Sequence, residues 1–187
     1  MLAQPTIRRP TSILDETDAA HEAFADLYRA HGGRVYAFVR YRVGDGAVAE
    51  DLTADVFARA WAKRGQLRSP EATVAWLFAT ARNLVTDHRR RRPDPLPLAA
   101  LPPDVHPLAG SPESGALVAA QLAEVRRLLT DLGDREREAI GLRFVAGLRN
   151  GEIALILGTS EGNVAKILHR ALRKLRERLP KEEPHAL

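Results

Sequence analysis

The 187-residue chain contains no cysteine, and aromatic residues make up only 5% of it. Without a thiol, the chain cannot form a disulfide, ligate zinc through cysteine or sense redox state on its own. No apolar stretch approaches the roughly 18–20 residues that span a bilayer. Residues 1–10 have two arginines and no apolar core, so a secretory signal is not expected. We therefore expect a soluble, cytoplasmic protein with no direct membrane insertion.

Motifs for catalysis and for cofactor binding are also missing. His21 and Glu22 begin like the HExxH motif of zinc proteases, but Ala25 occupies the position of the second histidine. The six histidines are scattered, and the sequence has neither a glycine-rich phosphate loop nor a nucleophile elbow. We therefore expect a protein that is not an enzyme and that holds no metal or cofactor.

Apolar residues instead recur at the spacing of an α-helix along most of the sequence. No segment alternates apolar and polar residues with the period of a β-strand. Seven of the twelve prolines lie between Pro93 and Pro112, where they prevent any helix of useful length. We interpret residues 93–115 as a semi-rigid linker with a reach of about 60 Å, the alternative being an ordered loop packed on one domain. The predicted fold class is all-α, with two small helical domains joined by this linker.

The charge distribution supports this division. Residues 1–92 carry 15 basic and 11 acidic side chains, the linker none and 3, and residues 116–187 carry 13 and 10. Two basic modules on either side of an acidic connector indicate two binding domains. The predicted organisation is extension, first domain, linker, second domain and tail, at residues 1–19, 20–92, 93–115, 116–180 and 181–187.

In the first domain, the apolar pattern predicts helices at about 23–43, 47–63 and 70–90. The first could be two helices, because Gly32 and Gly33 interrupt it. Ser69 is the expected cap of the third, and Pro70 suits its first turn. In the second domain, helices are expected at about 115–132, 134–145, 150–157 and 160–179. Asp134 is expected to cap the helix that it begins, without a complete capping box.

The last two of these helices carry the spacing of a helix-turn-helix motif. Ala154 is small where the helices would meet, and Gly158 tolerates the left-handed turn between them. Thr159 or Ser160 can cap the second helix. The stretch from Ser160 to Lys181 carries seven basic and two acidic side chains. Such a helix lies in the major groove, and the alternative is a solvated basic face.

Two features of the first domain indicate further partners. Asp51 and Asp55 lie one turn apart and suit a basic protein, although acidic residues early in a helix also favour its dipole. The next helix places an aromatic, polar and basic set on one face, which suits single-stranded or distorted DNA. This set is Trp76, Thr80, Asn83, Asp87 and Arg90, with Arg82 at its flank. The preceding loop, with Arg64, Gln66 and Arg68, could surround a flipped base. The alternative for Trp76 is a half-buried core position.

The segments AEDLTADVFARAWAKR and AWLFATARNLVTDHRRRR resemble the second region of bacterial RNA polymerase sigma factors. The segment GLRNGEIALILGTSEGNVAKILHRALRKLRERL resembles their fourth region. Two such domains joined by a short linker resemble the extracytoplasmic-function group of the sigma-70 family. The resemblance implies a sigma factor that directs promoter-specific initiation of transcription.

The resemblance also implies partners and roles. Core RNA polymerase would be bound through its clamp helices and its flap, promoter DNA through two elements, and an anti-sigma factor is a further expected partner. Polymerase contacts are expected at Asp51 and Asp55. Contacts to the −10 element are expected at Arg64, Gln66, Arg68, Trp76, Arg82, Asn83, Asp87 and Arg90. Contacts to the −35 element are expected at Ser160, Glu161, Asn163, Lys166, His169, Arg170 and Arg173.

Two other classes of protein remain open on the sequence. The segment DLGDREREAIGLRFVAGLRNGEIA also resembles a helix-turn-helix regulator of the response-regulator output type. Such a protein would carry a receiver or ligand domain, and residues 1–92 show no alternation of strands and helices. An adaptor that binds only protein is the other class, and the basic recognition helix argues against it.

Overall fold

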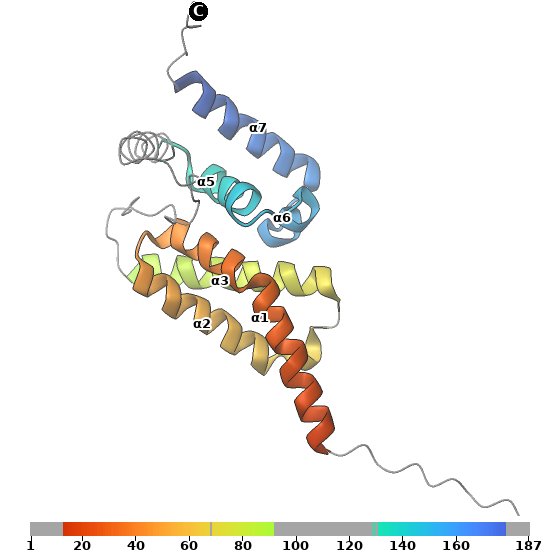
Figure 1. The fold of residues 1–187 in the computed structure, drawn as a ribbon. Helices are drawn as coiled ribbons and strands as arrows, with labels where there is room; N and C mark the ends of the chain where they lie inside the picture. The colour runs from red at the N-terminus through yellow and green to blue at the C-terminus, as the bar shows by residue number, and fades with distance from the viewer. Residues whose placement is uncertain (1–12, 68, 92–128, 130, 179–187) are drawn as a thin grey trace, which may run out of the picture.

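The computed structural model describes residues 13–67, 69–91, 129 and 131–178, and every regular element in these ranges is a helix (Figure 1). The all-α prediction is therefore confirmed for this part of the chain. The predicted linker, most of the predicted helix at 115–132, the tail from 181 and residues 1–12 of the extension lie outside the described residues. No described helix is both long and apolar enough to cross a bilayer.

The first domain consists of three helices that pack on one another: α1 (Ile13–Val43), α2 (Gly46–Ala62) and α3 (Pro70–Arg91). A short 3-10 turn, η1 (Arg64–Gln66), connects the last two. Each helix places large apolar residues in the shared core, including Phe38, Phe57 and Phe78. Burying these rings supplies the main favourable free energy of the domain.

The helix α1 continues through Gly32 and Gly33, so the break that the sequence suggested is wrong. A glycine in a helix costs only about 1 kcal/mol relative to alanine. Packing of this 31-residue helix against both neighbours outweighs that cost.

The helix starts in the first domain follow from capping side chains. Asp45 Oδ1 accepts a hydrogen bond of 2.9 Å from the Val48 amide at the start of α2. Ser69 Oγ accepts one of 3.3 Å from the Ala72 amide at the start of α3, which confirms the predicted cap. These caps set the residues at which α2 and α3 begin.

The second domain contains α5 (Asp134–Ile140), a π-helical turn η2 (Gly141–Val145), α6 (Asn150–Leu157) and α7 (Glu161–Arg178). The predicted helix at 134–145 is thus α-helical only in its first half. Its cap is Gly133 rather than Asp134, because Glu136 Oε2 accepts a 3.1 Å hydrogen bond from the Gly133 amide. Asp134 is free to pair elsewhere, and it does so with Arg137 at 3.1 Å.

The helices of the predicted helix-turn-helix form where the spacing placed them. Gly158 adopts φ 61° and ψ 46°, the left-handed conformation that glycine accepts without strain. The Thr159 amide donates to the Ala154 carbonyl at 3.0 Å, and Ser160 Oγ accepts from the Asn163 amide at 3.2 Å. The apolar face of α7 is buried at Val164, Ile167, Leu168 and Ala171.

The two domains pack against each other, α3 against α6 and α1 against η2. Figure 1 shows the second domain beside the three helices of the first. Arg34 Nε donates to the Ala146 carbonyl at 2.8 Å, and the Tyr41 hydroxyl donates to the Arg137 carbonyl at 3.3 Å. Gly141 lies so near α1 that an added Cβ would be 2.6 Å from the Tyr41 ring. The described helices therefore form one body, with its second domain docked on α1 and α3.

Candidate nucleic-acid interface

The helix α7 presents a polar and basic surface opposite its buried face. Six of the seven residues predicted for the −35 element are exposed: Ser160, Glu161, Lys166, His169, Arg170 and Arg173. The seventh, Asn163, is half-buried, and its side-chain amide donates to Thr159 Oγ1 at 2.8 Å. Asn163 therefore supports the turn in this structure, while Lys166 and Arg170 have unobstructed donors for a phosphate or a base edge.

Two other cations of α7 hold the second domain together. Lys174 Nζ lies 2.8 Å from Glu136 Oε2, and Arg178 pairs with Asp131. Burial of the Glu136 carboxyl opposes its ionisation, but hydrogen bonds from Lys174 and Gly133 outweigh this and lower its pKa. Both cations stabilise the packing of α7 and are less available to DNA than the exposed residues near its start.

The predicted DNA-facing surface of α3 divides into exposed and inward residues. Asn83, Asp87 and Arg90 are exposed, as a DNA contact requires. Thr80 is only 9% exposed and belongs to the interior. Trp76 is half-buried against the core, with Lys63 Nζ 5.9 Å from its ring centroid. The alternative interpretation of Trp76 as a core aromatic is the one that its packing favours.

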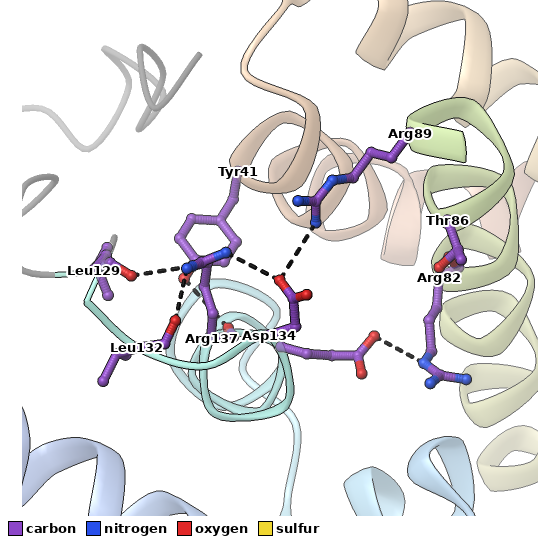
Figure 2. Close-up of polar contacts among 9 residues, drawn as sticks. Tyr41, Arg82, Thr86, Arg89, Leu129, Leu132, Asp134 and Arg137 are labelled. Carbon is purple, nitrogen blue, oxygen red and sulfur yellow. Dashed lines mark hydrogen bonds and ion pairs between the residues drawn. The ribbon is translucent and has the colours of Figure 1, made fainter. Parts of the chain in front are cut away.

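Arg82 has a partner that the sequence did not reveal. Its Nε lies 2.8 Å from Glu138 Oε1 in the second domain, and Glu138 is only 6% exposed (Figure 2). The two residues are 56 positions apart, so no local pattern links them. In the docked arrangement, Glu138 therefore pairs with the guanidinium of Arg82, which was predicted to contact DNA.

The loop before α3 is partly described. Arg64 of η1 folds back on the end of α2, since its guanidinium carbon lies 4.2 Å from the Trp61 ring centroid and its Nη1 donates to the Trp61 carbonyl. Gln66 is exposed, and Arg68 lies outside the described residues. A groove of about 770 Å³ runs beside the loop and is lined in part by Phe24, Leu27 and Leu67. The contribution of α1 to this groove could not be predicted from local sequence patterns, because α1 is distant in the chain.

The acidic pair on α2 faces away from the core. Asp51 and Asp55 are both exposed, and neither carboxylate makes an ion pair with any residue that the structure describes. The neighbouring Val56 and Phe57 are buried, which orients the helix. Two unpaired carboxylates one turn apart form an accessible surface for a basic protein partner.

Comparison with known proteins agrees with this geometry. The Sigma-70 region 2 model matches residues 27–93, and the Sigma-70 region 4 model matches residues 122–175. The chain is 34% identical over 161 residues to the ECF RNA polymerase sigma factor BldN of Streptomyces coelicolor. The aligned segment covers 85% of this chain and 61% of BldN. It is 31% identical over 166 residues to the RNA polymerase sigma factor CarQ of Myxococcus xanthus, covering 87% of this chain and 92% of CarQ.

Solved structures show the same two-domain fold. RpoE of Bartonella quintana, solved with the anti-sigma factor NepR, superposes with a TM-score of 0.67 at 25% identity over 87% of this chain and 99% of that one. CnrH, solved with the cytosolic domain of CnrY, gives a TM-score of 0.63 at 25% identity over 89% and 96%. The chain belongs to the sigma-70 family of RNA polymerase sigma factors, in its extracytoplasmic-function group. Below, the first domain is called region 2 and the second region 4.

Proposed function

We propose that this chain binds core RNA polymerase and directs initiation at promoters with a −35 and a −10 element, without catalysing a reaction itself. The observation that carries the proposal is the combination of an exposed basic helix-turn-helix in region 4 with a polar, cationic face on α3 of region 2. One protein with two such DNA-facing surfaces can read two separate elements. Initiation takes place in the cytoplasm, where core RNA polymerase is located.

In this proposal, α7 enters the major groove at the −35 element. Lys166, His169 and Arg170 are exposed on its first turns and approach the bases and flanking phosphates. Ser160 and Glu161 lie exposed at its beginning, where the hydroxyl of Ser160 can donate to a phosphate and the carboxylate of Glu161 can accept from the N4 amino group of a cytosine. Asn163 would contact DNA through the amide groups that its bond to Thr159 leaves free, and Arg173 through the guanidinium donors that do not face Glu177, whose carboxylate lies 3.7 Å from Arg173 Nε.

Region 2 acts on the −10 element. Asn83 and Asp87 are exposed polar groups that contact separated bases, while Arg90 and Arg82 bind the strand backbone. The Arg64–Gln66 turn and the adjacent groove between α1 and α3 receive an extruded base. Asp51 and Asp55 bind the clamp helices of the polymerase from the other side of the domain.

An anti-sigma factor is the proposed regulator of this chain. The similar proteins RpoE and CnrH were each solved with such a partner or with the cytosolic domain of a named partner. Both superpose on this chain over most of its length, so a comparable partner could bind the same two domains here. A thiol-based redox signal would have to be sensed by the partner, since this chain has no thiol of its own.

Run-off transcription with reconstituted core polymerase tests the proposal. We expect this chain to co-purify with the core enzyme and to open a promoter identified by selection from a random library. Tight binding of the isolated chain to duplex DNA, with no promoter opening by polymerase plus chain, would instead identify an ordinary helix-turn-helix regulator.

A further inference from the structure

A basic cleft of about 630 Å³ lies where region 2 meets region 4. We call it the arginine cleft, because five arginines line it: Arg42, Arg82, Arg89, Arg90 and Arg135. Four come from α1 and α3, and one comes from α5. Figure 2 shows Arg82 and Arg89 extending from α3 toward the helix that carries Asp134. The cleft thus draws its charge from both domains.

The positive charge of the arginine cleft is only partly neutralised. Its two acidic residues are already engaged, Glu138 with Arg82 at 2.8 Å and Asp134 with Arg89 at 3.8 Å. The side chains of the other three arginines make no ion pair with any residue in the described ranges. Five guanidiniums against two carboxylates leave three uncompensated positive charges in a confined space. Such a site attracts anions.

Arg42 is a second, independent sign of a missing counterion. Its side chain is 7% exposed, and its Nη1 is buried without a hydrogen-bond partner. Burial lowers the pKa of Arg42, although Glu138 nearby opposes this. A buried cationic donor without an acceptor is costly, and proteins normally pair it. The residue lines the same cleft, so an anion bound there would supply the negative charge that Arg42 lacks.

The chemistry of the lining identifies the kind of anion. Guanidinium groups match the geometry of phosphate oxygens and bind them through paired, charge-assisted hydrogen bonds. None of the described residues that line the cleft is aromatic, so nothing there would stack on a nucleobase. The volume is in the range of small-ligand sites, about 300–1,000 Å³. We propose that the arginine cleft binds a small anion with two or more phosphate groups, inorganic or nucleoside-linked, between regions 2 and 4.

Binding at this place has a mechanical consequence. Arg90 belongs to region 2 and Arg135 to region 4, so an anion held by both joins the domains in their docked arrangement. A ligand that binds one arrangement stabilises it by mass action. If the proposed function holds, this anion also competes with promoter DNA for Arg82 and Arg90.

Titration of the full-length chain with inorganic tripolyphosphate, at low ionic strength by calorimetry, tests the site. We expect one anion per chain and a rise in the thermal unfolding midpoint. The variant Arg90→Gln with Arg135→Gln should weaken binding about tenfold or more, because it removes two charge-assisted contacts. The matched control is Arg59→Gln with Arg176→Gln, which removes the same charge from exposed positions outside the cleft and should change affinity less than about twofold.

Two results would overturn the proposal: no saturable binding by the wild-type chain, or the same loss of affinity in both double variants. Arg42→Met supplies an independent check. It removes the unpaired buried charge, so it should raise the unfolding midpoint without anion and reduce the further rise on adding tripolyphosphate. A response to the anion equal to that of the wild type would count against the site.

A single-stranded oligodeoxynucleotide distinguishes the two sources of phosphate. The discriminating variant is Arg135→Gln, because Arg135 lines the cleft but lies outside the proposed −10 surface. If it weakens binding of the oligodeoxynucleotide as much as binding of tripolyphosphate, the nucleic-acid backbone is the occupant and the small-anion proposal is wrong. Weakened binding of tripolyphosphate alone supports the proposal. Because this titration needs no polymerase, its failure is separable from a failure of run-off transcription.

Discussion

Two buried arginines near the domain boundary, Arg42 and Arg137, differ in how their charges are compensated. Arg137 is 8% exposed and donates to the carbonyls of Leu129 and Leu132, at 3.0 and 2.7 Å, as well as to Asp134. Arg42 is 7% exposed and has a buried Nη1 without an acceptor. An unsatisfied buried donor costs about 1–3 kcal/mol. The contacts of Arg137 therefore stabilise the start of region 4. The unpaired Nη1 of Arg42 destabilises the fold, and a bound anion could offset this cost.

Tyr41 gives a residue-level prediction for alkaline pH. Burial raises the pKa of Tyr41 from 10.0 to about 12, outweighing the opposing charges of Arg42 and Arg137. Because the folded state disfavours the phenolate, this stability is complete below about pH 10 and is lost as pH rises toward about 12. Between about pH 9 and pH 11, the wild type should lose about 1 kcal/mol more stability than Tyr41→Phe.

Urea unfolding at the two pH values measures that difference. Tyr28→Phe is the matched control, because Tyr28 is 52% exposed and its substitution should leave the alkaline loss unchanged. Equal losses in the wild type and Tyr41→Phe would contradict the burial argument.

Asn83 and Asp87 give a prediction for DNA opening. Their side chains are exposed on α3 and have no structural role in the described ranges, so Asn83→Ala with Asp87→Ala should fold normally. Loss of two polar contacts to separated bases should reduce promoter opening about tenfold or more, with core-polymerase affinity within about twofold. Permanganate footprinting and a polymerase-binding assay measure the two quantities, with Glu22→Ala as the control. A parallel loss of opening and core binding would argue against the assigned roles.

Residue-level prediction from the sequence worked where the determinant was local. The Ser69 and Ser160 caps are confirmed, because a cap depends on amides only three residues away. The exposure of Asn83 was predicted, but the ion pair of Arg82 was not, since Glu138 lies in the other domain. The sequence patterns of single helices contain no information about such distant partners.

At the scale of elements, the best-predicted part is the pair α6 and α7. Its bounds, its left-handed glycine and its buried face follow from a few residues close together in the chain. The π-helical turn η2 was not predicted, and its buried Gly141 and Leu142 show that it is fixed by tertiary packing. The spacing of apolar residues alone does not distinguish a continuous α-helix from one that contains a π-helical turn.

The acidic pair of α2 gives a prediction for this element. Asp51→Arg with Asp55→Arg reverses two exposed, unpaired charges and should weaken binding to core polymerase about tenfold or more, through like-charge repulsion at the contact. Binding to −35 duplex DNA by the isolated chain should not fall. Fluorescence anisotropy of the labelled chain with core enzyme measures the first quantity.

A matched control is available on α1. Glu22→Arg with Asp26→Arg has the same spacing and the same change of charge at exposed positions. It should retain core affinity within about twofold, because net charge alone is a weak determinant of a specific contact. Equal weakening by both double variants would remove the support for a specific contact at α2.

At the scale of the whole molecule, the two regions are docked through groups that are far apart in sequence. Arg34 and Ala146 are 112 positions apart, and Tyr41 and Arg137 are 96 apart. The sequence analysis predicted two independent modules and gave no sign of this interface. Its geometry depends on the close approach of Gly141 to α1, which only the assembled fold reveals.

Gly141 gives a prediction for docking. The substitution Gly141→Ala adds a Cβ 2.6 Å from the Tyr41 ring, so the domains must shift or separate, at a cost of about 1–3 kcal/mol. Gly162→Ala is the control, since no atom lies within 4 Å of its added Cβ. Energy transfer between dyes at Ala58→Cys and Arg176→Cys should fall in the first variant only, and the absence of native cysteine makes the labelling specific. Unchanged transfer in both variants would show that the interface tolerates the added methyl group.

The hydrogen bonds from α1 to region 4 end on main-chain oxygens. Arg34 donates to the carbonyls of Ala146 and Gly147, and Tyr41 donates to that of Arg137. A main-chain acceptor persists whichever side chain occupies its position, so these bonds by themselves place no requirement on the side chains of the acceptor residues. The donors have no such freedom, because their side chains make the contact. The evolutionary constraint from these bonds therefore falls on Arg34 and Tyr41, and region 4 can diverge toward new promoters while keeping its place beside region 2.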